Sequence, residues 1–142
     1  MSEQNKAIVR RALEEGYNRG NLDAVDELVS EDFLAHTTSQ DIRGAEQMKH
    51  YIRELRGAFP DLHMVIEDQV GEGDKVVTRW TASGTHTGPF QGIPPTGKHG
   101  SMSGIDIDYV VDGKAVECWT ISDDLSLLQQ LGVIPVPEAV AR

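Results

Sequence analysis

The sequence predicts an α+β domain in which helices cover one face of a curved antiparallel sheet. Two patterns predict this class. Apolar residues recur every three to four positions in the first half of the chain, as in helices, and every second position in the second half, as in strands. A chain of 142 residues suits one hydrophobic core. We therefore expect a single domain over residues 1–142.

Three helices are expected before the sheet. The apolar residues of the first lie on one face, and Gly20 can end it. Asn21 can then cap the second helix, which is short. The Phe59-Pro60-Asp61 step ends the third, because a residue that precedes proline disfavours helical backbone. The expected helices span residues 6–17, 22–29 and 45–59, with an extended segment at residues 33–38.

The second half of the chain is expected to form a meander of antiparallel strands. Its strands are separated by a turn at residues 71–74, by a loop rich in Gly and Pro at residues 88–100, and by Asp112-Gly113. Ser122 can cap a final helix that runs to Leu131. The expected strands span residues 62–67, 75–85, 101–110 and 114–121.

The charge balance excludes several classes of partner. The formal net charge is -10, from 13 Lys and Arg residues against 23 Asp and Glu residues. Nucleic acid and anionic membranes would repel such a surface. The chain has no apolar run of membrane-spanning length, and residues 1–7 lack the apolar core of a signal peptide. We therefore expect a cytoplasmic protein that binds neither nucleic acid nor membrane.

Metal and nucleotide signatures are missing from the sequence. Cys118 is the only cysteine, and the five histidines are scattered, so no cluster has the spacing of a structural zinc site. Neither glycine-rich phosphate-binding motif occurs. We expect no metal and no nucleotide cofactor.

Several motifs together resemble the SnoaL-like polyketide cyclases of the nuclear-transport-factor-2-like superfamily. Phe59-Pro60-Asp61 and residues 33–36 are similar to that family in the first half of the chain. The more specific motifs lie in the second half. They are GTHTGPFQGIPPTGK at residues 84–98, Asp112-Gly113-Lys114, and Trp119 followed by LLQQLG at residues 127–132.

This resemblance implies a cone-shaped, cystatin-like α+β barrel with a deep apolar cavity for a small molecule, and homodimers formed through the outer face of the sheet. It also implies an intramolecular aldol condensation that needs no cofactor. Such a reaction needs a base that removes a proton next to a carbonyl, and a donor that stabilises the enolate. A carboxylate in a dry cavity suits the base, because desolvation raises its pKa.

The sequence departs from the pattern of this family at the site itself. The resemblance implies a His and an Asp on the last strand, but Cys118 and Thr120 occupy those positions. Two further polar positions on the preceding strand align with Gly104 and Asp106. Asp106 is therefore the candidate catalytic acid or base, with Cys118 and Thr120 as candidate substrate contacts.

The hairpin between the last two strands decides which face of the sheet Asp106 occupies. A two-residue turn at Asp112-Gly113 sets Asp108 against Glu117, which is unfavourable because both are carboxylates. A three-residue loop, which we prefer, sets Asp106 against Cys118 and sends both toward the cavity. The ordinary interpretation of alternating Ile and Asp is the opposite one, with the Ile side chains buried and Asp106 in water.

The preferred register also predicts an apolar outer face that a second copy of the chain would cover. Ile105, Ile107, Tyr109, Trp119 and Ile121 would share this face.

Other polar and aromatic residues have both structural and functional interpretations. His36 can line the pocket or lie at an ordinary strand edge, and His86 can contact ligand at the cavity mouth or serve the loop. Trp80 can contact substrate or pack in the core. Asp123 is expected to cap the last helix. His50, His63 and His99 are expected at the surface.

Three functions are compatible with the sequence. The first is a cyclase, or a related lyase, isomerase or hydroxylase, that acts on an apolar polyketide-like carbonyl compound. The second is a protein of the same fold that binds a small ligand without chemistry. The third is a dimerisation domain with a closed core and no cavity.

Overall fold

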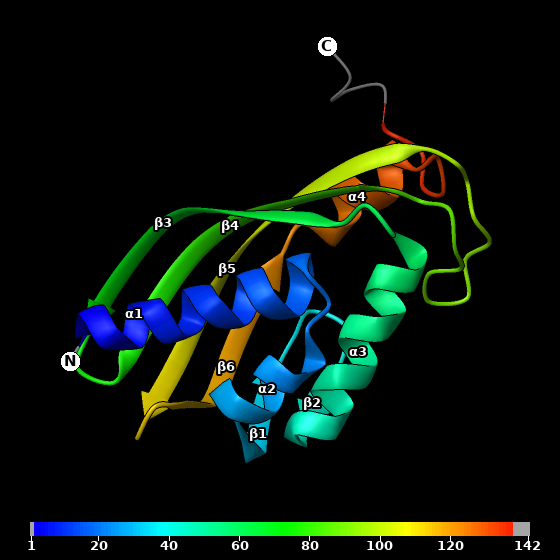
Figure 1. The fold of residues 1–142 in the computed structure, drawn as a ribbon. Helices are drawn as coiled ribbons and strands as arrows, with labels where there is room; N and C mark the ends of the chain where they lie inside the picture. Colours follow the sequence, from blue (N-terminus) through cyan, green and yellow to red (C-terminus); the bar gives the residue numbers. More distant parts are fainter. Residues whose placement is uncertain (1, 138–142) are drawn as a thin grey trace.

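The computed structural model describes residues 2–137, which form a curved six-stranded sheet with helices against its concave face (Figure 1). The helices are α1 (Ser2–Arg11), the π-helical segment η1 (Ala12–Asn18), α2 (Leu22–Leu28), α3 (Gly44–Ala58) and α4 (Asp124–Gln130). The strands are β1 (Val29–His36), β2 (Asp41–Arg43), β3 (His63–Glu72), β4 (Lys75–Thr85), β5 (His99–Val111) and β6 (Lys114–Ser122). The predicted α+β class is confirmed.

The sheet is mixed and unclosed, which corrects the expected fully antiparallel barrel. Its strand order is β2-β1-β6-β5-β4-β3. The meander of β3 to β6 is antiparallel, but β1 pairs with β6 in parallel. A parallel pair needs a long connection between its strands, and here the whole of α3 and the meander supply it. The short strand β2, absent from our prediction, pairs with β1 and forms one edge.

The helices differ from the prediction mainly at their ends. The first expected helix is longer and divides into α1 and η1. Asp123 caps α4, as expected, and its side chain accepts a hydrogen bond from the Ser126 amide at 3.1 Å. Ser122 is not the cap, because its hydroxyl donates to Asp124 at 2.6 Å instead. None of the helices in residues 2–137 is long and apolar enough to cross a bilayer.

The β5–β6 hairpin has a register that neither alternative predicted. Asp112 and Gly113 form a two-residue turn with φ of 51° and 80°, as a type I′ turn requires. A bulge follows, at which Val116 of β6 has no partner on β5. Asp108 therefore pairs with Cys118 rather than Glu117. The predicted three-residue loop is wrong, but the predicted sharing of faces is correct, because the bulge also changes the register by one residue.

The apolar core lies between the concave face of the sheet and the helices. One cluster joins α1, the end of α3 and α4 to the meander, and includes Leu13, Phe59, Trp80 and Val110. A second cluster joins α2 and α3 to β1 and β6, and includes Val25, Phe33 and Ile52. The space that these clusters leave between them contains the candidate site.

Candidate active site

A mainly apolar cavity of about 150 Å³ lies between the concave face of the sheet and the helices. Its walls come from both core clusters, and the two buried carboxyl groups in its lining come from β5. At one end it meets an open groove of about 400 Å³ between α3 and the loop after β4. The cavity and the groove share Tyr51, Leu55, Phe90 and Gln91. This end is therefore the mouth of the cavity.

Asp106 lies on the inner face of β5 and lines the cavity. Asp106 is 8% exposed, and one of its carboxylate oxygens accepts a hydrogen bond from Trp80 Nε1 at 2.9 Å. Burial raises the pKa of Asp106 to about 6, although the Trp80 and Thr120 hydrogen bonds lower it in part. The structure therefore has Asp106 facing the cavity and not bulk water. Its carboxyl changes protonation state close to neutral pH.

Asp108 lies two residues further along the same face and was missed as a site residue. It is 7% exposed and pairs across the sheet with Cys118. Its Oδ2 is buried and has no hydrogen-bond partner among the described residues. Burial, and then the charge on Asp106, raises the pKa of Asp108 to about 8. The alternation in β5 predicts this position, because residues 106 and 108 of a strand share a face.

The contact between Trp80 and Asp106 depends on the glycine at position 104. Trp80 pairs with Gly104 across β4 and β5, and a Cβ atom at Gly104 would lie 2.3 Å from the Trp80 ring atom Cζ2. The missing side chain therefore gives the indole room to lie along β5 and reach Asp106. Trp80 fills both expected roles, since it is a buried core residue and also lines the cavity.

Cys118 and Thr120 line the cavity beside the two carboxyls, on the face where we expected them. The Cys118 sulfur and the Thr120 hydroxyl oxygen are 3.4 Å apart. Burial raises the pKa of the Cys118 thiol above its usual value, so the sulfur is a protonated group rather than a nucleophile.

Within residues 2–137, one cluster of side chains could coordinate a metal ion, and it consists of Asp106, Asp108 and Cys118. The ligand atoms of Asp106, Asp108 and Cys118 all lie within 4.8 Å of one another. A cation would first have to displace the proton of a thiol that burial holds on its sulfur.

Two tyrosines that we did not predict face this polar group from the helices. Tyr17 of η1 and Tyr51 of α3 both line the cavity. Burial raises the pKa of Tyr17 well above its usual value and that of Tyr51 to about 12, so both hydroxyls keep their protons. Their spacing marked them only as buried helix residues. They can donate hydrogen bonds to an oxygen of a bound molecule.

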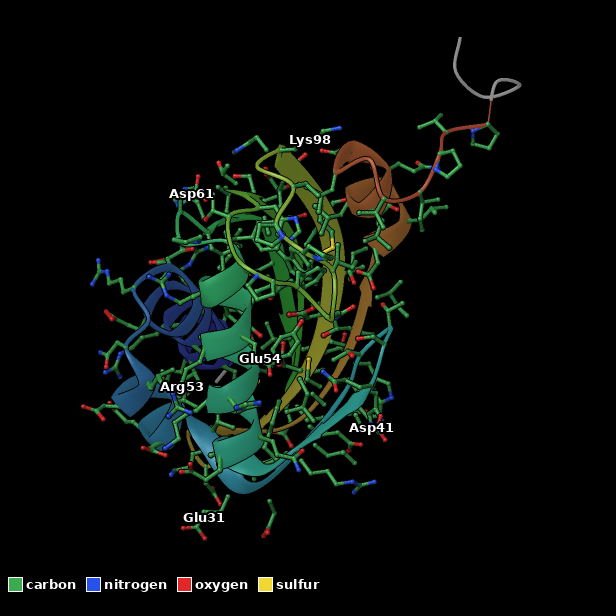
Figure 2. The ribbon with its side chains drawn as sticks, turned by 90° about the vertical axis from the view of Figure 1, so that its right-hand side faces the viewer. Glu31, Asp41, Arg53, Glu54, Asp61 and Lys98 are labelled. Carbon is green, nitrogen blue, oxygen red and sulfur yellow. The ribbon has the colours of Figure 1, made fainter. Side chains whose placement is uncertain are left out.

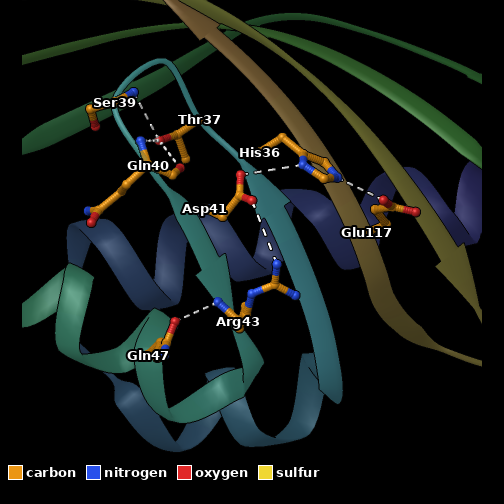
Figure 3. Close-up of polar contacts among 8 residues, drawn as sticks. All are labelled: His36, Thr37, Ser39, Gln40, Asp41, Arg43, Gln47 and Glu117. Carbon is orange, nitrogen blue, oxygen red and sulfur yellow. Dashed lines mark hydrogen bonds and ion pairs between the residues drawn. The ribbon is translucent and has the colours of Figure 1, made fainter.

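His36 does not lie with this group, which corrects its expected place in the pocket. It lies on the outer face of the sheet, where its ring stacks on Trp119 with 5.1 Å between centroids. Its Nε2 lies 2.8 Å from a Glu117 oxygen, and its Nδ1 lies 3.5 Å from an Asp41 oxygen (Figure 3). The physical reason is strand alternation: Ala35 of β1 faces the core, so its neighbour His36 faces outward.

His86 is also outside the cavity lining. It is fully buried between Phe59 and Phe90. Its Nδ1 accepts a hydrogen bond from the Thr96 amide at 3.2 Å, so its place is that of an anchor for the loop after β4. Its neighbour Phe90 lines the cavity, whereas His86 itself does not. His50, His63 and His99 are exposed, as expected.

The outer face of the sheet is apolar where the inner face is acidic. Ile105 and Ile107 of β5 and Trp119 and Ile121 of β6 lie there, with exposed fractions from 39% to 72%. Charged side chains also project from the surface, as Figure 2 shows for Glu31, Arg53, Glu54, Asp61 and Lys98, and for Asp41, which lies beside His36 on the outer face of the sheet.

Sequence and structure comparisons identify the class of protein that this fold and cavity define. Residues 7–131 match the family model of the SnoaL-like polyketide cyclases. The chain belongs to this family.

Particular relatives include cyclases of known name. The chain is 31% identical over 136 residues to the aklanonic acid methyl ester cyclase DnrD of Streptomyces peucetius, covering 92% of this chain and 93% of that protein. Its structure is similar to that of TsrD from Streptomyces laurentii, with a TM-score of 0.85, 32% identity, and coverage of 94% of this chain and 98% of the other. IdmH from Streptomyces antibioticus gives a TM-score of 0.79 and 36% identity, with coverage of 92% and 99%.

Proposed function

We propose that this protein catalyses an intramolecular aldol ring closure on an apolar polyketide-like ester, without a cofactor, and that Asp106 is its acid–base group. The observation that carries the proposal is the burial of the Asp106 carboxylate in an apolar cavity, with one oxygen held by Trp80. A base is most efficient when its pKa lies near the working pH, and burial raises the pKa of Asp106 toward that range.

The groups around Asp106 suit the rest of this chemistry. The proton that Asp106 removes comes from carbon next to a carbonyl group, and the enolate oxygen then needs hydrogen-bond donors. Tyr17 and Tyr51 keep their protons and line the opposite wall of the cavity, so both can serve as donors. Cys118 and Thr120 are proposed to contact the substrate beside Asp106. His36 and His86 are left out, because neither lines the cavity.

The substrate class is proposed from both the cavity and the relatives. The lining is mainly apolar and contains no Lys, Arg or His among the described residues, which favours an uncharged, apolar molecule. The relative DnrD is named for aklanonic acid methyl ester, so this ester is a suitable first test compound. Large substrates would extend through the mouth into the groove beside α3.

A homodimer through the outer face of the sheet is part of the proposal. Ile105, Ile107, Trp119 and Ile121 form one exposed apolar face, and a second copy of the chain would remove it from water. This surface is separate from the cavity, which lies on the other side of the same strands.

The test is conversion of aklanonic acid methyl ester, and of a panel of related polyketide esters, by the purified protein. An aldol ring closure gives a product of unchanged mass that separates from the substrate on chromatography. Asp106→Asn is expected to lower kcat/KM by about 100-fold or more. The matched control is Asp112→Asn in the exposed β5–β6 turn, whose backbone suits Asn. Equal activity in Asp106→Asn and wild type would rule out Asp106 as the base.

A second candidate function is ligand binding without chemistry. It is favoured by Cys118 and Thr120, which replace the His and Asp that the family resemblance implies. Calorimetry that shows tight binding of an ester, with no product after long incubation, would support this alternative. Product formation from any bound ester would exclude it.

A further inference from the structure

We propose that Asp108 is the proton donor of this cavity, and that Asp106 and Asp108 act as one acid–base pair that holds a single proton in the resting site. The two carboxyls lie two residues apart on the inner face of β5, and both line the cavity. Their nearest oxygens lie within 4.8 Å of each other. This inference rests on the proposed function, because it assigns the second group that the same reaction needs.

Among residues 2–137, no cationic side chain lines the cavity and could balance two negative charges on the pair. The other ionisable groups that line the cavity are Tyr17 of η1, Tyr51 of α3, Cys118 of β6 and Asp124 of α4. None of these is positively charged in any protonation state. Two ionised carboxylates so close together in an apolar cavity would repel each other strongly. One retained proton removes this repulsion.

Hydrogen bonding decides which carboxyl keeps the proton. Asp106 accepts a hydrogen bond from Trp80 Nε1, and such a bond favours the ionised form. Oδ2 of Asp108 is buried without a hydrogen-bond partner among the described residues, and the Cys118 thiol beside this carboxyl offsets only part of the rise that burial gives its pKa. An ionised oxygen in that position would be unsolvated and unpaired, which is costly, whereas a proton on it makes a donor available to a bound molecule. Asp108 is therefore the protonated member of the pair.

The pair completes the proton balance of an aldol ring closure. Asp106 takes the proton from carbon, so the C–H bond breaks and an enolate forms. The enolate carbon attacks the acceptor carbonyl, so a C–C bond forms and the carbonyl oxygen gains the electron pair. Asp108 gives its proton to that oxygen. The proton that Asp106 took from carbon then passes to Asp108. The resting pair is restored with no net change in protons.

The first test is the pH profile of kcat/KM for aklanonic acid methyl ester. The wild type and the Asp112→Asn control should give a bell, with activity rising as Asp106 ionises near pH 6 and falling as Asp108 ionises near pH 8. Asp108→Asn should lower kcat roughly 10- to 100-fold with little change in KM, and the alkaline limb of the bell should disappear. An unchanged alkaline limb in Asp108→Asn would overturn the proposal, because a merely structural role would leave that limb in place.

The second test needs no turnover. Carboxyl ¹³C resonances of aspartate-labelled protein, recorded against pH, should show one buried carboxyl that ionises near neutral pH and a second that ionises above it. In Asp106→Asn the pKa of Asp108 should fall, because the neighbouring charge is gone. If no ester is converted, the proposed function fails, and this titration still decides whether the pair shares a proton. Two buried carboxyls that both ionise near pH 4 would overturn the pair. A shift of both resonances on addition of Zn²⁺, with proton release, would show that Asp106 and Asp108 bind a cation. That result would also overturn the proposed acid–base pair.

Discussion

The two faces of β5 differ in a way that is the reverse of an ordinary surface strand. Its inner face carries Asp106 and Asp108, which are 8% and 7% exposed, and its outer face carries Ile105 and Ile107, which are 47% and 39% exposed. A half-buried strand usually turns its apolar side chains inward. This arrangement is unfavourable on both faces, because it buries carboxyl groups on one and exposes apolar side chains on the other. The inner carboxyls need protons or a ligand, and the outer isoleucines need a protein surface.

The largest effect on stability is expected from the packing of the inner face. Gly104→Ala puts a Cβ atom against the rigid Trp80 indole, which cannot move without leaving Asp106. The free energy of unfolding should fall by about 3 kcal/mol, because overpacking a well-packed core is destabilising. Urea unfolding measures this change. Ser103→Ala, on the exposed outer face of the same strand, should shift it by less than about 0.5 kcal/mol. Equal values for the two variants would show that the indole is free to relocate.

The protonation of the inner face should make stability depend on pH. The pKa of Asp108 is raised on folding, so the folded state holds a proton that the unfolded chain has released above pH 4. The wild type should therefore lose stability as pH rises from about 4 through 8. Asp108→Asn removes this loss and should be more stable than wild type at pH 9, on the order of 2 kcal/mol. Thermal unfolding of both proteins from pH 5 to pH 9 measures the difference, and parallel curves would refute the raised pKa.

The outer face should control association and leave the cavity intact. Ile107→Lys places a charge at the centre of the proposed dimer surface, and should weaken the dimer at least tenfold, which is about 1.4 kcal/mol. Sedimentation equilibrium measures this, with Ser101→Lys near the end of the same strand as the matched control. A wild type that is monomeric at high concentration would contradict the proposed dimer and leave the exposed apolar face unexplained.

An effect of similar size to that on the dimer is expected from the single hydrogen bond to Asp106. Trp80→Phe keeps the ring and removes the Nε1 donor that stabilises the ionised carboxylate. The pKa of Asp106 should rise by about one unit, because a hydrogen bond to a charged group contributes about 1.5 kcal/mol. The acid limb of the pH–activity profile should move upward by the same amount. Trp119→Phe, on the outer face, should leave that limb where it is.

The sequence predicts which residues share a face of the sheet better than it predicts how the strands are paired. Asp106, Cys118 and Thr120 were grouped correctly on one face, because the predicted loop and the observed bulge both shift the β5–β6 register by one residue from that of a plain two-residue turn. The detailed register could not be predicted, because a bulge at Val116 depends on long-range pairing rather than on the turn sequence.

The errors at the site have equally local causes. The sequence left His36 either in the pocket or at a strand edge, and the burial of its neighbour Ala35 decides for the outer face of the sheet. Tyr17 and Tyr51 carry only a helical apolar pattern, and nothing in that pattern shows that their hydroxyls line a cavity. Asp108 could have been predicted from its spacing to Asp106 alone.

The most direct test of the account is hydrogen exchange at the substrate carbon. A polyketide ester that lacks the acceptor carbonyl cannot close its ring, but in D₂O it can still lose and regain the proton next to its own carbonyl. The wild type and Asp112→Asn should catalyse deuterium uptake at that carbon, and Asp106→Asn should slow it by about 100-fold. Equal uptake with Asp106→Asn and wild type would contradict the claim that the buried carboxylate of β5 is the base.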